Sequence, residues 1–269
     1  MLKLRCFLKL IFHDLAWELR LILAALVLPA RHRDILKALR SNGAVVVPGY
    51  YSEDEMQVIE ASCNQALDEA VDMPITKGKL IRMEGSIRLQ HLDKRKPLLR
   101  RFARDAYLVF LNFIFEGKLS WPSVMYGVTH DGTYEHPAVP GKASARFGGH
   151  YHVDQWRHQL KGLTPLDDVV LENGPLAYIP GTSGIHWKRF DNYLAKFREA
   201  FVGKGAADGA ALTYNSNPLD KEYFDELVKR KGVQYATCKR GDLVLFDTRN
   251  LHYATELTAG RRRIVWMYF

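Results

Sequence analysis

Apolar side chains in the N-terminal half of the chain recur mostly at the spacing of helices. Residues 33–40 and 98–115 form two such stretches, and a compact β-branched run at 44–48 predicts a strand between them. Ser52 is followed three residues later by Glu55, which is the reciprocal capping arrangement of a helix start. Apolar residues then follow at positions 56, 59, 63, 66, 67 and 70. This spacing predicts a helix with one buried face.

The pattern changes from about Ser123 onward, where short apolar or alternating runs are separated by Gly, Pro, Asn and Asp. Strands are expected at 124–128, 146–154, 160–165, 176–179, 233–238, 243–246 and 264–269. Several strands with turn signals between them favour a barrel or sandwich over a parallel βαβ sheet. Residues 203–217 are rich in Gly and Ala and predict a long loop. Such a loop is either a lid or a surface insertion.

The N-terminal segment combines charge with an apolar run at 21–30. Residues 1–42 carry eight Lys or Arg and three Asp or Glu, which is more than half of the net charge of +8. Charged residues interrupt the stretch and Pro29 ends it, so neither a secretory signal nor a spanning helix is expected. Two interpretations stay open: a helix packed on the outside of the core, which is favoured, or a basic amphipathic helix on an anionic membrane surface. We therefore divide the chain into an N-terminal helical segment, 1–40, and a domain over 41–269.

Composition limits the class of protein. A chain of 269 residues with 47% hydrophobic and 25% charged residues suits one substantial globular core. Cys6, Cys63 and Cys238 lie far apart without CxxC spacing, which argues against a disulfide framework or a thiolate zinc site and suits a reducing cytosol. Charge is nearly balanced outside residues 1–42, so no nucleic-acid partner is expected. The expected location is cytoplasmic, with peripheral membrane contact through the basic N-terminus as the alternative.

His152 and Asp154 lie two residues apart in one of the predicted strands. Side chains at this spacing point to the same face, so an imidazole and a carboxylate project together. A third ligand from another strand would complete one face of an octahedral metal site and leave three positions open. Two histidines and one carboxylate with open positions suit Fe(II) oxygenases. A Gly-Asp turn at 241–242, an apolar strand and then His252 follow later in the chain.

These residues resemble the phytanoyl-CoA dioxygenase-like family of Fe(II)/2-oxoglutarate-dependent oxygenases over residues 41–269. The most specific pieces are His152-Val-Asp154, the stretch Glu172-Asn-Gly-Pro-Leu-Ala-Tyr-Ile-Pro-Gly-Thr182, the run at 241–247 with His252, and an arginine-led final strand. The resemblance implies a double-stranded β-helix (a cupin-like jelly roll) supported by helices. This agrees with the mainly β fold that the pattern predicts.

The resemblance implies that His152, Asp154 and His252 bind Fe(II), and that an arginine at the start of the last strand grips the distal carboxylate of 2-oxoglutarate. A bidentate guanidinium suits that task better than lysine. Arg262 is favoured and Arg263 is second, with Arg261 also open. Strand parity offers a test, since Arg262 would face inward with the side chains at 264 and 266, and Arg263 would share the face of 265 and 267.

The implied reaction consumes O₂ and 2-oxoglutarate and hydroxylates a small-molecule or lipid-like substrate, releasing succinate and CO₂. Halogenating relatives lack the carboxylate of Asp154, so hydroxylation, or a related desaturation or ring closure, is expected. Two other functions stay open: a redox-neutral metal enzyme on the same barrel, or a catalytically silent binding module. The loops at 129–149 and 184–217 are expected to select the substrate.

Other residues near these motifs are assigned plainer roles. His150 is expected to neighbour the metal or line the pocket rather than bind the ion, and His186 is expected to pack in a loop. The expected core residues are Trp156 and Trp266, and the basic triplet at 229–231 is expected to be a solvated helix end. The side chains that could line the pocket, each at least as suited to a structural role, are Tyr126, Arg146 and Gln159.

Overall fold

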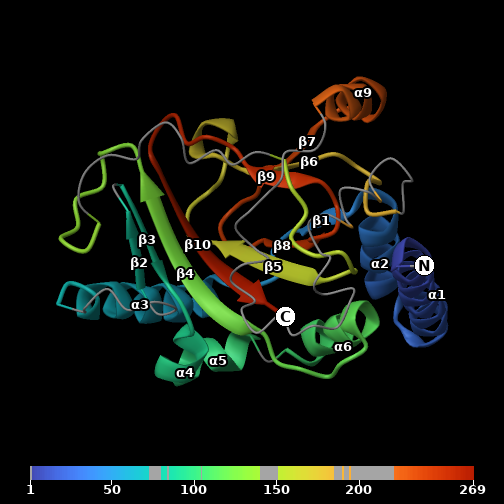
Figure 1. Cartoon of the computed structure of the whole chain (residues 1–269). Helices are drawn as coiled ribbons and strands as arrows, with labels where there is room; N and C mark the ends of the chain where they lie inside the picture. The colour runs from blue at the N-terminus through green and yellow to red at the C-terminus, as the bar shows by residue number, and fades with distance from the viewer. Residues whose placement is uncertain are drawn as a thin grey trace.

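Two antiparallel sheets pack face to face in the computed structural model, with helices on the outer side of the larger sheet (Figure 1). The structure describes residues 2–72, 80–83, 85–103, 105–139, 151–184, 190, 194 and 221–269. The larger sheet has the order β1-β8-β5-β10-β4-β3-β2 and the smaller has the order β7-β6-β9. Helices α3 to α6 lie beneath the larger sheet in Figure 1, and α1 and α2 lie at its right-hand end.

The strands of the larger sheet are β1 (Ala44–Val47), β2 (Leu80–Met83), β3 (Ser86–Leu89), β4 (Ser123–His130), β5 (Leu160–Pro165), β8 (Leu243–Asp247) and β10 (Arg261–Tyr268). Those of the smaller sheet are β6 (Leu176–Tyr178), β7 (Gln234–Ala236) and β9 (His252–Ala254). Apolar side chains from both sheets, among them Leu163, Leu176 and Ile264, form one cluster between them. The expected antiparallel sheets with supporting helices are confirmed.

Helices make up 43% of the described residues, more than the mainly β prediction implied. They are α1 (Leu2–Val27), α2 (Ala30–Asn42), α3 (Glu53–Glu69), α4 (Leu92–Arg95), α5 (Pro97–Ala103), α6 (Ala106–Glu116), the 3₁₀ turn η1 (Leu171–Asn173) and α9 (Lys221–Lys231). The predicted capping box is present at the start of α3, where the Glu55 amide donates to Ser52 Oγ and the Ser52 amide donates to the Glu55 carboxylate.

The single helix predicted at 98–115 is wrong, because the structure has two helices there. The Asp105 side chain accepts hydrogen bonds from the amides of Tyr107 and Leu108 and so caps a new helix start. Most of the strand predicted at 146–154 lies outside the described residues, because residues 140–150 lie outside the described part of the chain. At 151–154 the structure has only an isolated bridge at His152.

Helix α1 packs against the rest of the molecule along one face. Trp17, Leu21 and Ala24 join a buried cluster that also holds residues of α6 and of the larger sheet. Asp14 on the same helix forms an ion pair with Arg249, a fully buried side chain just after β8. This face of α1 therefore packs as the favoured interpretation of the N-terminal segment expects, on the outside of the core. Within the described residues no helix is both long enough and apolar enough to cross a bilayer.

Candidate metal centre and cosubstrate pocket

Backbone pairing brings together the three residues that the sequence proposed as metal ligands. The His152 amide donates to the His252 carbonyl (3.0 Å) and the His252 amide donates to the His152 carbonyl (3.1 Å), so the two histidines face each other across an antiparallel bridge. The Asp154 amide donates to the carbonyl of Thr248 (2.9 Å). One ligand atom from each of the three side chains lies within 4.8 Å of the others. The polypeptide therefore places two imidazoles and a carboxylate around one point.

The Asp154 carboxylate is buried and surrounded by cationic or polarisable groups. Lys161 Nζ lies 2.5 Å from Asp154 Oδ2, His152 Nε2 lies 3.3 Å from Oδ1, and His252 Nε2 lies 3.7 Å from Oδ2. Burial alone would raise the pKa of Asp154, but Lys161 and the two histidines outweigh it and hold the pKa well below its ordinary value. The carboxylate is therefore ionised, as a metal ligand must be.

The environment of His252 fixes which ring nitrogen is free to bind a metal. His252 Nδ1 lies 2.8 Å from the carbonyl oxygen of Asn250, which accepts only, so Nδ1 carries the proton. Burial lowers the pKa of His252, although the nearby Asp154 carboxylate opposes this, and the neutral ring is favoured. Nε2 then directs its lone pair toward the Asp154 carboxylate. A cation at this point relieves the repulsion between these acceptors, and the two-histidine, one-carboxylate set suits Fe(II).

The segment before His252 is fixed by a buried network that includes the last residue of the Pro-Gly-Thr motif. Asn250 Oδ1 accepts from the amide and hydroxyl of Thr182 (both 2.9 Å), and Asn250 Nδ2 donates to the carbonyl of Ile179 (3.0 Å). The Leu251 amide donates to Thr182 Oγ1 (2.9 Å). Because these partners are fully or almost fully buried, the motif holds the strand that carries His252 in register with its neighbours.

The three arginines at the start of β10 have different surroundings. Arg263 is held by Asp167 (Nε to Oδ2, 2.7 Å) and Glu60 (Nη1 to Oε1, 2.6 Å), and Arg261 also contacts Asp167 (3.1 Å). Arg262 has no carboxylate partner among the described residues and lines a pocket between the two sheets with Ile264, Trp266 and residues of β6, β7 and β9. The predicted parity is therefore confirmed, with Arg262 inward and Arg263 outward.

The Asn-Gly-Pro motif makes room for Arg262. Gly174 has φ +73°, and a Cβ atom at this position would lie 2.8 Å from Arg262 Nη1 and 2.7 Å from the carbonyl oxygen of Thr255. Glycine is thus required both by the backbone conformation and by the close approach of the guanidinium. Burial, with a smaller effect of Arg88, lowers the pKa of Arg262 to about 10, so the side chain stays charged at neutral pH. This leaves a cation inside the pocket.

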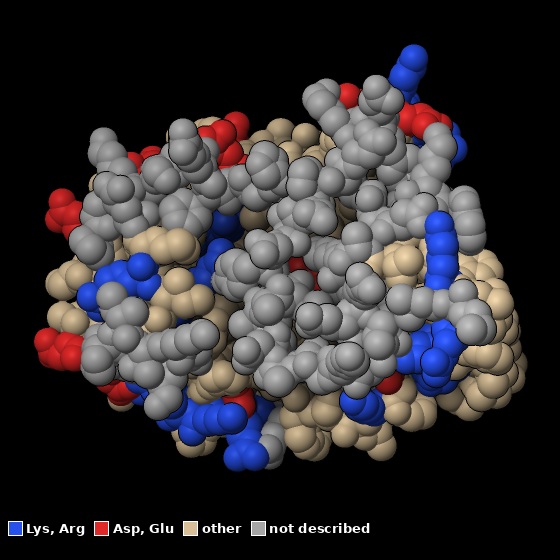
Figure 2. Space-filling model, in the orientation of Figure 1, with Lys and Arg blue, Asp and Glu red and all other residues tan. Residues whose placement is uncertain are grey.

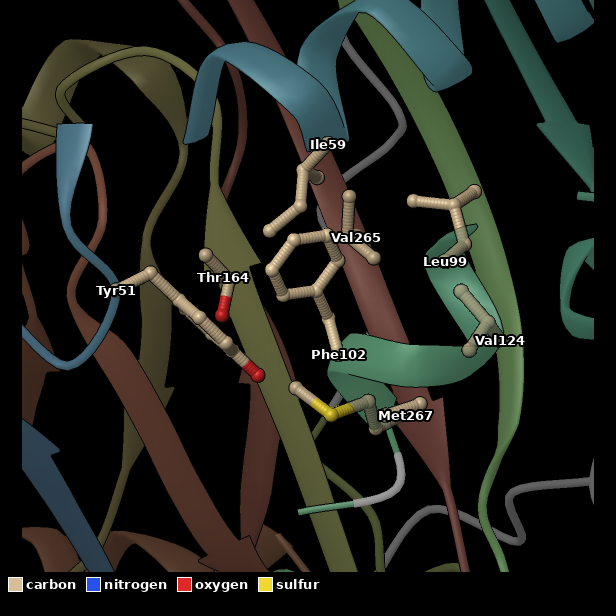
Figure 3. Close-up of a pocket in the computed structure, with 9 residues that line it drawn as sticks. Tyr51, Ile59, Leu99, Phe102, Val124, Thr164, Val265 and Met267 are labelled. Carbon is tan, nitrogen blue, oxygen red and sulfur yellow. The ribbon is translucent and has the colours of Figure 1, made fainter. Parts of the chain in front are cut away.

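The opposite face of β10 closes a separate apolar cavity beneath α3 and α5 (Figure 3). Val265 and Met267 point into it, as Figure 3 shows, together with Tyr51 and Phe102. Its volume is about 20 Å³, enough for a single water molecule at most. It is a packing defect rather than a substrate site.

The remaining residues singled out in the sequence have mixed outcomes. Tyr126 is fully buried in the cluster beneath the larger sheet and so does not line the inner pocket. Gln159 Nε2 donates to the Phe269 carbonyl (3.3 Å), a structural role. Trp266, expected in the core, is half-buried and lines the pocket, and Trp156 is half-buried against a smaller cluster. The candidates that lie outside the described residues are Arg146, His150, His186 and the loop at 203–217.

Sequence reasoning missed Lys161. It lies on β5 between a buried leucine and a glycine, pairs across the sheet with Phe246 and Tyr268, and its Nζ lies 4.6 Å from the centroid of the Tyr268 ring. A lysine inside a predicted buried strand is a signal that could have been used, because such a charge needs a partner. The identity of the partner, Asp154, depends on the path of the loop between them.

A family model described as phytanoyl-CoA dioxygenase (PhyH) matches residues 39–264. Three solved structures are similar in fold. EctD from S. alaskensis in its apo form has 20% identity and a TM-score of 0.58, with 89% of this chain and 76% of that chain covered. The epimerase SnoN, in complex with Fe³⁺, alpha-ketoglutarate and nogalamycin RO, has 15% identity and a TM-score of 0.59 (90% and 84% covered). AviO1 from Streptomyces viridochromogenes Tue57 has 15% identity and a TM-score of 0.56 (90% and 95% covered). A search of curated proteins found no match to this sequence.

The family match and the His–Asp–His cluster together define the class of protein, a non-haem Fe(II)/2-oxoglutarate-dependent oxygenase. The chain belongs to the phytanoyl-CoA dioxygenase family.

Proposed function

We propose that His152, Asp154 and His252 bind the iron, that Arg262 binds the distal carboxylate of 2-oxoglutarate, and that the enzyme hydroxylates a small molecule with release of succinate and CO₂. The observation that carries this proposal is the convergence of the three ligand side chains, two of them 98 residues apart in sequence, within 4.8 Å. Arg263, the second choice from sequence, is less suited because two carboxylates already neutralise it.

The domain that carries this site, residues 41–269, is proposed to be a double-stranded β-helix. Its strand order supports this, since β4, β10, β5 and β8 lie side by side in the larger sheet, and the segment at His152, then β9, β6 and β7, lie side by side in the smaller one. In each sheet, strands from the start and the end of this region alternate, as two hairpins wound together require.

The chain's own residues prepare the site for iron and cosubstrate. Lys161 keeps Asp154 ionised and occupies one of its oxygens, which leaves the other for the metal. The Asn250 carbonyl fixes the His252 tautomer that offers Nε2. When bound, the iron supplies the activation of O₂ coupled to oxidation of 2-oxoglutarate. Arg262 and Ala254 line the same pocket between the two sheets. Ala254 lies two residues beyond His252 on β9, so the two side chains share a face of that strand, and Arg262 faces the space beside the proposed metal ligands.

Hydroxylation is the proposed reaction because the carboxylate ligand is present. EctD has been solved with 2-oxoglutarate and 5-hydroxyectoine, and SnoN with nogalamycin RO. A small-molecule substrate for this chain is consistent with both. A lipid-like substrate is the narrower form of this proposal, supported by the exposed apolar side chains of α1.

The test is O₂-dependent conversion of 2-oxoglutarate to succinate by protein purified without oxygen and loaded with Fe(II). We expect loss of iron and of succinate formation in Asp154→Ala and His252→Ala. Arg262→Met should retain iron while the KM for 2-oxoglutarate rises by at least ten-fold, about 1.4 kcal/mol, since one bidentate ion pair is lost. The matched control is Arg261→Met on the same strand, which should leave this KM almost unchanged. Zinc selectivity without 2-oxo-acid binding, or unchanged behaviour of Asp154→Ala, would refute the proposal.

A further inference from the structure

Helix α1 exposes a continuous stripe of large apolar side chains on the side that faces away from the core. The stripe consists of Leu4, Leu8, Phe12, Leu15, Leu19, Ile22, Leu23, Leu26 and Val27, which are 43–75% exposed. These are nine of the nineteen exposed large apolar side chains in the described part of the chain. They are concentrated on one helix of 26 residues, so the stripe is a local feature and not the scattered exposure that any protein surface shows.

The stripe lies opposite the face that packs on the core. Leu8 is exposed and Leu10 is fully buried, and two residues on a helix are separated by about 200° around its axis. The same relation holds for Leu19 and Leu21. The stripe recurs every three or four residues and runs from Leu4 to Val27, about 35 Å along the helix. A helix that is apolar on two opposite faces requires a second apolar environment besides the core.

The charge around the stripe identifies that environment. Arg5 and Lys9 are exposed on α1 directly after two residues of the stripe, and Arg31, Arg33 and Lys37 are exposed on the neighbouring helix α2. The exposed acidic residue of these two helices is Asp34 alone, since Asp14 and Glu18 are half-buried and paired with arginines. In Figure 2 the right-hand edge, where α1 lies, is mostly free of charged residues, with Lys and Arg side chains beside it.

We propose that α1 docks this enzyme on the surface of an anionic lipid bilayer, with the apolar stripe in the interfacial layer and the basic residues against the headgroups. An apolar stripe bordered by Lys and Arg is the combination that binds such surfaces. A second copy of the chain is less suited as the occupant, because it would bring an equal excess of positive charge to the same contact. The surface is separate from the iron site, so this proposal stands independently of the reaction.

Deletion of α1 cannot test the proposal, because Trp17 and Leu21 belong to the core and Asp14 neutralises a buried arginine. The stripe itself must be changed in the full-length protein. The variant is Phe12→Gln/Leu15→Gln/Leu19→Gln, three neighbours on the stripe replaced by a good helix former. The matched control is Val170→Gln/Leu171→Gln, two exposed apolar residues at the 3₁₀ turn η1 on another part of the surface.

The measurement is flotation with vesicles of phosphatidylcholine alone or with 30% phosphatidylserine, at 0.1 M and 0.5 M NaCl. We expect the native protein and the control to bind the anionic vesicles, to bind neutral vesicles at least ten-fold more weakly, and to be released by the higher salt. The triple variant should lose at least ten-fold in binding while keeping its melting temperature and succinate formation. Arg5→Gln/Lys9→Gln should weaken binding about five-fold per charge.

Two results would overturn the proposal. One is equal flotation of the native protein and the triple variant, or no flotation of either. The other is a native dimer in light scattering that becomes a monomer in the triple variant, without flotation, which would assign the stripe to contact between copies.

Discussion

Lys161→Met tests whether the ionised state of Asp154 depends on a single buried cation. The substitution keeps most of the volume of the side chain but removes its charge. Lys161 Nζ lies 2.5 Å from the carboxylate, and the two side chains are 16% and 8% exposed. Breaking such a buried pair by removing one partner costs about 3–5 kcal/mol, and the partial exposure of Lys161 favours the lower value, about 3 kcal/mol.

The direction of the pKa shift of Asp154 determines that Lys161→Met destabilises the folded protein. A carboxyl whose pKa is lowered on folding stabilises the folded protein at neutral pH, and this stabilisation is lost as pH falls through its folded pKa. Without Lys161 the pKa of Asp154 rises and the stabilisation at pH 7 is lost. At about 2–4 °C per kcal/mol for a chain of this size, the metal-free protein should melt about 6–12 °C lower.

The assay is thermal unfolding at pH 7 in the presence of EDTA and then of Mn(II), an inert substitute for Fe(II). We expect Mn(II) to raise the melting temperature of Lys161→Met more than that of the native protein, because the metal replaces the missing positive charge. Lys94→Met, at an exposed lysine of α4, is the control. If the melting temperature of metal-free Lys161→Met lay within about 2 °C of that of the metal-free native protein, the reasoning would be refuted.

Three further changes have defined outcomes. Gly174→Ala should destabilise the fold by about 1–3 kcal/mol, because its φ is +73°, and should weaken 2-oxoglutarate binding as Arg262 is displaced, measured by calorimetric titration. Asp14→Asn should lower the free energy of unfolding in urea by about 3 kcal/mol, because it removes the carboxylate that forms an ion pair with the buried Arg249. Burial and neighbouring cations lower the pKa of His13 to about 3, so stability should fall by about 1.4 kcal/mol for each unit as pH falls from 6.5 toward about 3, and His13→Gln should flatten this slope.

Each of these changes has a control or a contrary result. Gly184→Ala, where a Cβ atom would meet nothing within 4 Å, should leave both stability and binding unchanged. Asp34→Asn changes an exposed residue of α2 and should have the same free energy of unfolding in urea as the native protein. If His13→Gln showed the same decline in acid as the native protein, the buried neutral histidine would not be its cause.

The cluster of the proposed metal ligands could be predicted because local sequence carries most of the information about it. The spacing of His152 and Asp154 places both side chains on one face, and the Gly-Asp turn and apolar strand before His252 mark another strand. Strand parity predicted that Arg262 and Arg263 lie on opposite sides of the larger sheet, and alternate residues of β10 do face opposite sides of it.

The partners of buried charges could not be predicted, because they come from distant parts of the chain. Asp14 and Arg249 are separated by 235 positions, and nothing in either segment identifies the other. The outer stripe of α1 was hidden for a different reason. Apolar residues occupy two opposite faces of this helix, so a helical period alone does not say which face is buried.

The most direct test of the central claim is a crystal structure of the full-length protein with Mn(II) and 2-oxoglutarate, prepared without oxygen. We expect one anomalous peak bonded to His152, Asp154 and His252, and the distal carboxylate of 2-oxoglutarate paired with Arg262. A metal ion bound elsewhere, or a cosubstrate held by Arg263 with Arg262 unoccupied, would contradict the account.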